Sequence, residues 1–142
     1  RHPNLVAIKM GGTDTSQLAY ILEAAPALQC FFVEFGYAAM RDRYECALIA
    51  AISGGKPVWA REFFEARGPR LAAMVDEANE ARIVLKDHIG GTGAHMDGAF
   101  DKVNLKLLIP EFPLRLLPPY TAADDATYAR YLDDLPPAWR QP

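Results

Sequence analysis

Lys9 is the residue of this chain whose type and position most directly suggest covalent chemistry. It follows the short apolar run Leu5–Ile8, and barrels and doubly wound α/β sheets build their active sites at the carboxyl ends of such strands. Shielding by Ile8 and Phe31 would keep more of the lysine amine neutral, and a neutral amine attacks a ketone to form a Schiff base. The alternative is an ordinary lysine that extends from the end of a strand into solvent.

Two glycine-rich turns follow apolar runs in the same way. Met10–Asp14 comes directly after Lys9, and Ser53–Lys56 comes after the third apolar run. Backbone N–H groups in such a turn, at the start of a helix, bind anions. Neither turn matches a phosphate-binding or dinucleotide-binding motif, and glycines are also needed simply to let a chain turn.

Three further residues are possible metal ligands, and they lie around a third glycine-rich stretch: His88, His95 and Asp97. Their spacing across Ile89–Gly98 fits no established metal-binding motif, so no metal is expected. The sequence also lacks the serine motif of the α/β hydrolases.

The remaining reactive side chains are the thiols and one carboxylate. The chain has 2 cysteines, Cys30 and Cys46, and no secretory signal sequence. Such cysteines are more often reduced thiols packed in a core than partners in a disulfide. Glu34, at the end of the second apolar run, is a candidate general acid or base if it points inward. Otherwise it is expected to be solvated.

The pattern of apolar residues predicts three strand-helix pairs in the first half of the chain. Short runs of β-branched and aromatic residues predict the strands, and apolar residues at helical spacing predict the helices. This order implies parallel strands joined by right-handed crossovers. Strands are expected at Leu5–Ile8, at Cys30–Val33 in a run that ends at Gly36, and at Ala47–Ile52, and helices at Thr13–Ala25, Ala38–Glu45 and Val58–Ala66.

The second half of the chain is expected to be helical. Apolar residues at helical spacing from Leu71 to Leu85 predict a long helix that ends near His88, and the glycines of Ile89–Gly98 predict a loop. Prolines then enforce an extended segment between two further helices. These helices are expected at Ala99–Ile109 and Thr121–Leu135.

The composition is that of an ordinary globular protein. The 142 residues carry a net charge of -3, with 15 Lys+Arg against 18 Asp+Glu, and 51% of them are hydrophobic. This balance excludes intrinsic disorder and a disulfide-built miniprotein, and without a basic patch no nucleic-acid partner is expected. No run is long and apolar enough for a membrane span, so we expect no membrane partner and a cytoplasmic location.

Three parallel strands do not complete a barrel, which needs eight strand-helix units. The chain is therefore expected to be either part of a barrel followed by helices or a very small open doubly wound sheet. The outer strands Leu5–Ile8 and Ala47–Ile52 have no Lys or Pro inside the run to protect a free edge. For this reason we expect further residues of the same polypeptide, or another chain, to complete the sheet.

Four segments, in order, are similar to segments of one known family. His2–Lys9, followed by a glycine-containing turn and Asp14, resembles the sixth strand of the dihydrodipicolinate synthase and N-acetylneuraminate lyase family. Phe31–Gly36 resembles the seventh strand, Leu48–Pro57 the eighth, and Phe112–Tyr120 the proline-flanked segment before the last helix. The resemblance spans essentially the whole chain.

The resemblance implies a fold and a reaction. The fold would be α/β, with residues 1–68 as the C-terminal three strand-helix units of a (β/α)8 TIM barrel and residues 69–142 as its last helices and a helical C-terminal extension. Lys9 would be the catalytic lysine of a class I lyase or aldolase, forming a Schiff base with pyruvate or a related 2-oxo acid. Gly11, Gly36 and Ile49 would bind that substrate. The Schiff-base reaction needs no cofactor and no metal. The resemblance also implies a homo-oligomer and an active site that the first half of the barrel completes.

The chain departs from this family at two positions. Met10 stands where an acidic residue often follows the lysine, and Tyr37 stands where the seventh strand commonly carries aspartate. These departures favour an alternative function, a catalytically weak or inactive barrel that binds a 2-oxo acid or a sugar acid as a binding or regulatory protein. A purely structural half-barrel is a further alternative, and it leaves the lysine unexplained.

Overall fold

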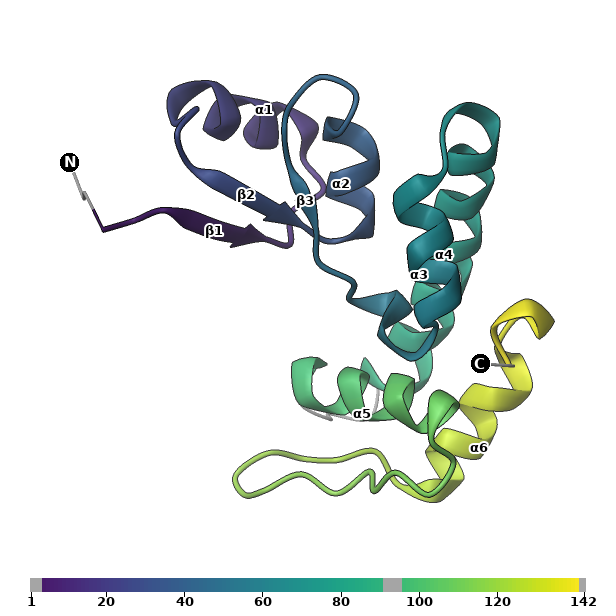
Figure 1. Ribbon diagram of the computed structural model, residues 1–142. Helices are drawn as coiled ribbons and strands as arrows, with labels where there is room; N and C mark the ends of the chain where they lie inside the picture. The colour runs from purple at the N-terminus through teal and green to yellow at the C-terminus, as the bar shows by residue number, and fades with distance from the viewer. Residues whose placement is uncertain (1–3, 91–95, 141–142) are drawn as a thin grey trace. The chain divides into compact units, whose positions relative to one another are not determined.

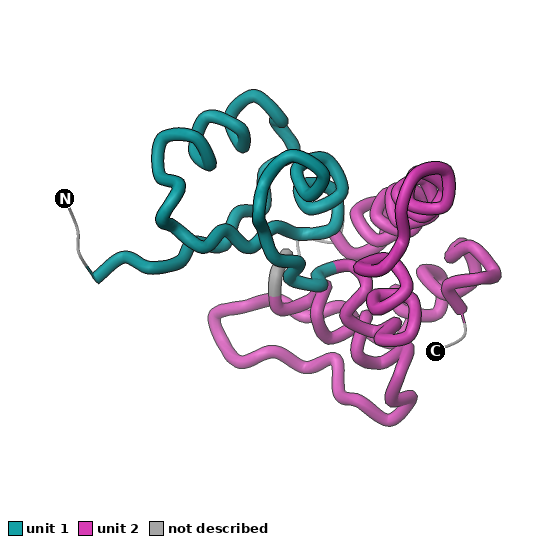
Figure 2. Tube along the Cα trace, turned by 45° about the horizontal axis from the view of Figure 1, so that its top comes forward, with its two compact units in different colours: residues 1–51 teal, residues 52–142 magenta. Residues whose placement is uncertain are grey.

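The computed structural model of the protein describes residues 4–90 and 96–140. The chain forms two compact units, residues 1–51 (unit 1) and residues 52–142 (unit 2), coloured differently in Figure 2. Unit 1 holds the strands and the first two helices, and unit 2 is helical. The sequence predicts a different boundary, after residue 68, between the barrel units and the helical extension, and this boundary stays a prediction.

Unit 1 contains a parallel sheet of three short strands (Figure 1). They are β1 (Ala7–Met10), β2 (Gln29–Phe32) and β3 (Ala47–Leu48), in the order β1-β2-β3. In the register, Lys9 lies opposite Phe31, and Phe31 lies opposite Ala47. The parallel α/β arrangement expected from the sequence is confirmed.

Two helices connect these strands, α1 (Thr15–Ala24) and α2 (Glu34–Met40), and they lie on the same side of the sheet (Figure 1). Asp14 caps α1 by accepting hydrogen bonds from the backbone N–H groups of Ser16 and Gln17 at 2.9 and 3.2 Å. Right-handed crossovers between strands that follow one another in the sheet place both helices on one face. Neither helix covers the other face, which we call the open face.

The core of unit 1 lies between the sheet and these two helices. Strand side chains alternate between the two faces, and Cys30 and Phe32 are fully buried whereas Phe31 is half-buried. Gly36 lets α2 approach the sheet closely, because a Cβ at this position would lie 3.2 Å from the Cβ of Phe32. The other buried apolar residues of this unit are Leu18, Leu22, Tyr37 and Met40.

Unit 2 consists of helices and the loops between them. They are the 3-10 helix η1 (Ile52–Gly55), α3 (Pro57–Glu65), α4 (Gly68–His88), α5 (Met96–Leu108), α6 (Asp125–Asp134) and the 3-10 helix η3 (Pro137–Trp139). Helix η1 packs tightly on α5, because a Cβ on Gly55 would lie 2.7 Å from the carbonyl carbon of Asn104. Pro57 lies in the first turn of α3, where its missing N–H costs no hydrogen bond.

An aromatic cluster holds three elements of unit 2 together. Trp59 on α3 stacks on Phe63 with ring centroids 5.0 Å apart, and it lies at the same centroid distance from Trp139 of η3. The indole N–H of Trp59 donates to the carboxylate of Glu77 on α4 at 3.0 Å. Because Phe63 is fully buried and Trp139 is 2% exposed, this cluster belongs to the core of the unit.

The strands differ in detail from those predicted. β1 spans Ala7–Met10 instead of Leu5–Ile8, and its residues are exposed or half-buried. No strand among the described residues pairs with its outer edge. β2 ends at Phe32, and Gly36, where the apolar run was expected to end, lies inside α2. β3 is short because the chain turns into η1 instead of staying extended to Ile52.

The predicted helices are present with shifted ends. α2 begins at Glu34 rather than Ala38, directly after the sheet, and α5 begins at Met96 rather than Ala99. α6 begins directly after its cap, Asp124. The proline-rich segment between α5 and α6, expected to be extended, forms neither helix nor strand, because proline cannot continue a helix.

The fold is therefore α/β with a small parallel sheet and six α-helices among the described residues. Over the same residues the strands do not close into a barrel. Within residues 4–90 and 96–140, no helix is both long and apolar enough to span a membrane.

Candidate functional site

The candidate site lies on the open face of the unit 1 sheet. The register pairs Lys9 with Phe31 and Phe31 with Ala47, and residues paired in this way point to the same face. Cys30 and Phe32 point to the opposite face, where α1 and α2 bury them fully. The amine of Lys9 therefore lies on the open face, beside the strand that carries the aromatic ring of Phe31.

Backbone hydrogen bonds extend this ladder beyond the strand ends. The N–H of Val33 donates to the carbonyl oxygen of Met10 at 3.4 Å, and the N–H of Ile49 donates to that of Phe32 at 2.8 Å. Because side chains alternate, Ile49 lies on the open face just beyond the end of β3. Gly11 occupies the corresponding place after β1 and is exposed.

The structure places three of the four residues that the family resemblance assigns to the site on one face or edge of the sheet. Lys9, Gly11 and Ile49 all belong to the open face or its carboxyl edge. Gly36 does not, because it lies in α2 on the covered side, where its Cα position is enclosed by Phe32 and Leu18. Its role in the structure is to permit close packing of α2.

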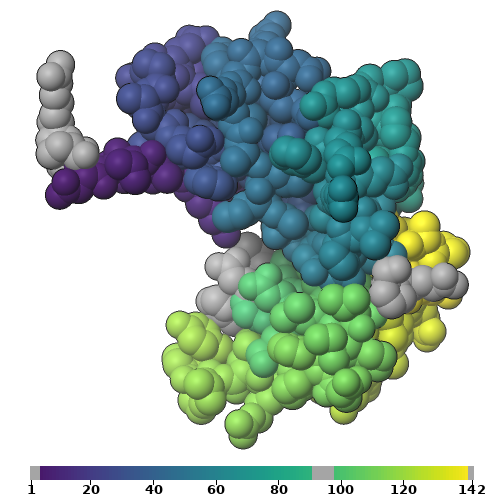
Figure 3. Space-filling view, viewed as in Figure 1, coloured from purple at the N-terminus to yellow at the C-terminus, as the bar shows by residue number. Residues whose placement is uncertain are grey.

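Lys9 is exposed to solvent, contrary to the shielding expected from its neighbours. Ile8 precedes it by one residue and therefore points to the other face of the sheet. Phe31 flanks it but is itself only half-buried. In Figure 3 the purple atoms of the first described residues project from the rest of unit 1.

Glu34 is buried rather than solvated. It is 1% exposed, and its Oε1 atom accepts a hydrogen bond from the backbone N–H of Ala51 at 2.8 Å. As the first residue of α2 it also places a negative charge at a helix N-terminus, where such a charge is stabilised. Glu34 therefore ties the segment after β3 to the start of α2 and serves the architecture of the sheet edge.

Comparison with known proteins adds nothing to this geometry. No protein-family model, curated protein or solved structure matches the chain. The resemblance to the dihydrodipicolinate synthase and N-acetylneuraminate lyase family stays a prediction that rests on its four segments. The site is therefore defined by the position of its residues alone.

Lys56 is a second unusual lysine, and it belongs to unit 2. Burial lowers its pKa, and the residue is only 6% exposed. Its Nζ donates to the carbonyl oxygen of Ala138 at 2.8 Å and lies 6.0 Å from the centre of the Trp139 ring. The turn Ser53–Lys56 therefore joins α3 to η3 in the structure. Nothing in the local sequence signals this, because the acceptor lies 82 residues later.

Of the three candidate metal ligands, the structure describes only the side chain of His88. His88 Nε2 lies 2.8 Å from Asp134 Oδ2, at the end of α6. His95 and the side chain of Asp97 lie outside the described residues. Among the residues that are described, no group of three or more His, Cys, Asp or Glu side chains could hold a metal ion.

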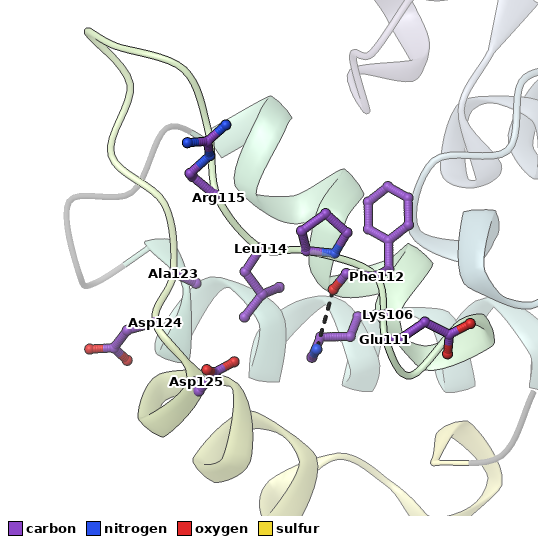
Figure 4. A pocket seen from close by; sticks show the side chains of 9 residues that line it. Lys106, Glu111, Phe112, Leu114, Arg115, Ala123, Asp124 and Asp125 are labelled. Atoms are coloured by element: carbon purple, nitrogen blue, oxygen red, sulfur yellow. Dashed lines mark hydrogen bonds between the residues drawn. The ribbon is translucent and has the colours of Figure 1, made fainter.

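A groove of about 430 Å³ lies in unit 2 between α5, the proline-rich segment and the start of α6 (Figure 4). Lys106 lines it, and its Nζ donates to the carbonyl oxygens of Pro110 and Phe112 at 2.8 and 3.2 Å. Asp124 also lines it and caps α6 by accepting from the N–H of Thr127 at 2.7 Å. Both charged side chains are therefore engaged in hydrogen bonds to the backbone, which give them a structural role in this groove.

Proposed function

We propose that Lys9 is the nucleophile of a class I lyase or aldolase, forming a Schiff base with pyruvate or a related 2-oxo acid. The observation that supports this is the position of Lys9 on the open face of a parallel sheet, opposite Phe31 in the register. Among the described residues the Lys9 amine has no hydrogen-bond or ion-pair partner, whereas the amine of Lys56 is held by Ala138. The amine of Lys9 is thus open to a ligand, whereas that of Lys56 is not.

The proposal includes the C-terminal part of a (β/α)8 barrel. The strands neighbour one another in sequence order with α1 and α2 on one face, whereas a doubly wound sheet carries helices on both faces. In a barrel, the helix-free face points to the packed interior. Phe31 and Ile49 on the open face would then be covered by further strands, contributed by the same polypeptide or by another chain. A homo-oligomer and a cytoplasmic location stay predictions.

The reaction would use the Lys9 amine alone as its covalent catalyst. The neutral Nζ attacks the carbonyl carbon of the 2-oxo acid, water leaves, and a protonated imine forms. The imine draws electrons from the neighbouring carbon, so that a carbon–carbon bond next to it forms or breaks. Hydrolysis then releases the product and restores the amine. In this chain Phe31 would flank the amine, and Gly11 and Ile49 would line the substrate.

A second candidate function is a binding or regulatory protein that holds a 2-oxo acid or sugar acid without efficient turnover. The exposure of Lys9 favours it, because a lysine open to water is the ordinary state of a surface side chain. Tyr37, one of the departures from the family, is 2% exposed, and the Arg41 guanidinium lies 4.6 Å from its ring centre. Tyr37 is therefore part of the core between the sheet and the two helices.

Trapping with borohydride separates the two functions. The full-length protein is mixed with pyruvate and sodium borohydride, which reduces a formed imine to a stable amine on the lysine. We expect one adduct on Lys9, found in the tryptic peptide 2–41, because the modified lysine is no longer cleaved. The peptide 44–61 carries Lys56 and serves as an internal control for labelling of a different lysine.

The matched variant is Lys9→Arg, which keeps the positive charge but cannot form an imine. We expect it to abolish the adduct. Absence of an adduct in the unmodified protein, or equal labelling after Lys9→Arg, would support the binding protein instead.

A further inference from the structure

The two cysteines lie opposite each other in neighbouring strands. β2 and β3 pair in parallel with Phe31 opposite Ala47. One step back along the same register places Cys30 opposite Cys46. Neighbouring strands lie about 4.8 Å apart, and a disulfide bridges Cα atoms at about 4.4–6.8 Å. The backbone therefore holds the two residues at a distance that a disulfide can span.

Both thiols point to the covered face of the sheet. Phe31 and Ala47 point to the open face, so the residues before them, Cys30 and Cys46, point the other way. Burial, and after it the electrostatic effect of Cys30, raises the pKa of Cys46. Both residues are free thiols in the structure.

The two thiols differ in access. Cys30 is fully buried, whereas Cys46 is half-buried and lies just before β3. A small oxidant therefore reaches Cys46 first. The register then keeps Cys30 beside it as the second thiol.

We propose that Cys30 and Cys46 form a reversible intrachain disulfide when the protein meets a small-molecule disulfide. The bond closes the loop that contains α2 and joins β3 to β2. The paired part of β3 is only Ala47–Leu48, so a covalent link would hold the edge of the sheet far more firmly than its few hydrogen bonds. This site is independent of the chemistry proposed for Lys9.

The oxidation consists of two thiol–disulfide exchanges. The Cys46 thiolate attacks one sulfur of the small disulfide, a mixed disulfide forms on Cys46, and the other half leaves as a thiolate. The Cys30 thiol then loses its proton, its sulfur attacks Sγ of Cys46, and the second half leaves. The two protein thiols are oxidised and the small disulfide is reduced to two thiols. An excess of a small thiol reverses both steps.

Burial slows this exchange without preventing it. Burial raises the pKa of Cys30 as well as that of Cys46, so little of either is thiolate at neutral pH. The Cys30 thiol also donates a weak hydrogen bond to the carbonyl oxygen of Leu28 at 3.6 Å. The experiment is therefore done at mildly alkaline pH.

The test is disulfide mapping of the native full-length protein after incubation with glutathione disulfide and blocking of the remaining thiols. Trypsin separates the cysteines, because cleavage after Arg41 and Arg43 leaves Cys30 in peptide 10–41 and Cys46 in peptide 44–61. We expect these two peptides joined to each other, in protein of unchanged oligomeric state. Dithiothreitol should release them.

Two variants identify the order of the steps. Cys30→Ala should stop at the mixed disulfide on Cys46, and Cys46→Ser should leave Cys30 unmodified. The proposal is overturned if the unmodified sequence stops at the mixed disulfide, stays fully reduced, or forms the bond between two chains. Because the decision rests on the unmodified sequence, a variant that fails to fold does not change the result.

Discussion

The carboxylate of Glu34 accepts a 2.8 Å hydrogen bond from the backbone N–H of Ala51, which fastens the segment after β3 to the first turn of α2. Glu34 is almost completely buried, and removing a buried acceptor leaves its donor without a partner. This bond holds the carboxyl edge of the sheet, where the candidate site lies.

Replacing Glu34 should therefore loosen unit 1. We expect Glu34→Ala to lower the free energy of unfolding by about 1–3 kcal/mol, because the N–H of Ala51 loses its acceptor. Hydrogen exchange at the Ala51 amide, measured by NMR, should accelerate. The control is Glu34→Gln, which keeps an acceptor oxygen and should retain most of the protection. Equal exchange in all three proteins would contradict this role.

The two glycines predicted to bind substrate should respond differently to alanine. At Gly36 an added Cβ would lie 3.2 Å from Phe32 Cβ and 3.3 Å from Leu18 Cδ1, whereas at Gly11 it would meet nothing within 4 Å. Overpacking costs about 1–3 kcal/mol, and the gain in helix propensity at Gly36 offsets only about 1 kcal/mol. Gly36→Ala should thus lower the urea midpoint followed by circular dichroism, and Gly11→Ala should leave it unchanged. A stable Gly36→Ala would show that α2 does not need this close approach.

Acid should weaken unit 2 through the cap of α6. Hydrogen bonds from Thr127, the backbone N–H first, lower the pKa of Asp124 below its usual value. A carboxylate with a depressed folded pKa stabilises the fold above its unfolded value of about 3.9, and this contribution is lost as the pH falls through the folded value. Asn keeps the cap but does not titrate. Between about pH 5 and pH 3, Asp124→Asn should therefore lose less thermal stability than the unmodified protein.

Tryptophan fluorescence measures this unfolding selectively, because Trp59 and Trp139 both belong to unit 2. If the unfolding temperatures of the unmodified protein and of Asp124→Asn decrease by the same amount as the pH is lowered, Asp124 does not contribute to acid sensitivity and the prediction is wrong.

A chelator should not affect trapping at Lys9. The imine itself withdraws the electrons that a metal would otherwise polarise, so EDTA is expected to leave the yield of the reduced pyruvate adduct unchanged. The yield is measured by peptide mass before and after dialysis. Loss of the adduct with EDTA and its recovery with a divalent ion would direct attention to His88, His95 and Asp97.

The sequence by itself determined the local elements of this protein. Asp14 caps α1, Pro57 opens α3, and apolar residues spaced from Leu71 to Leu85 form the buried face of α4. Each of these signals acts through neighbours a few residues away, so each can be read from the linear pattern. The alternation of strands and helices, and hence the parallel sheet, follows from them.

Local pattern did not predict which polar side chains are buried. From the sequence, Glu34 is expected to be solvated unless it points inward, and Lys56 stands out only as the last residue of a glycine-rich turn. In the structure both side chains are buried, and each has a backbone hydrogen-bond partner. Those partners, Ala51 and Ala138, lie 17 and 82 residues away. A hydrogen bond of this kind exists only once distant segments have packed together.

Tertiary structure also decided where the chemistry-bearing residues point. The sequence marks Lys9 as a strand lysine, but only the pairing of Ala7 with Gln29 turns it to the open face, because a slip of one residue would send it under α1 and α2. The same register, continued to β3, brings Cys30 opposite Cys46. Side chains alternate with a period of two residues, so their direction depends on how separate strands align, and that alignment is a property of the folded sheet.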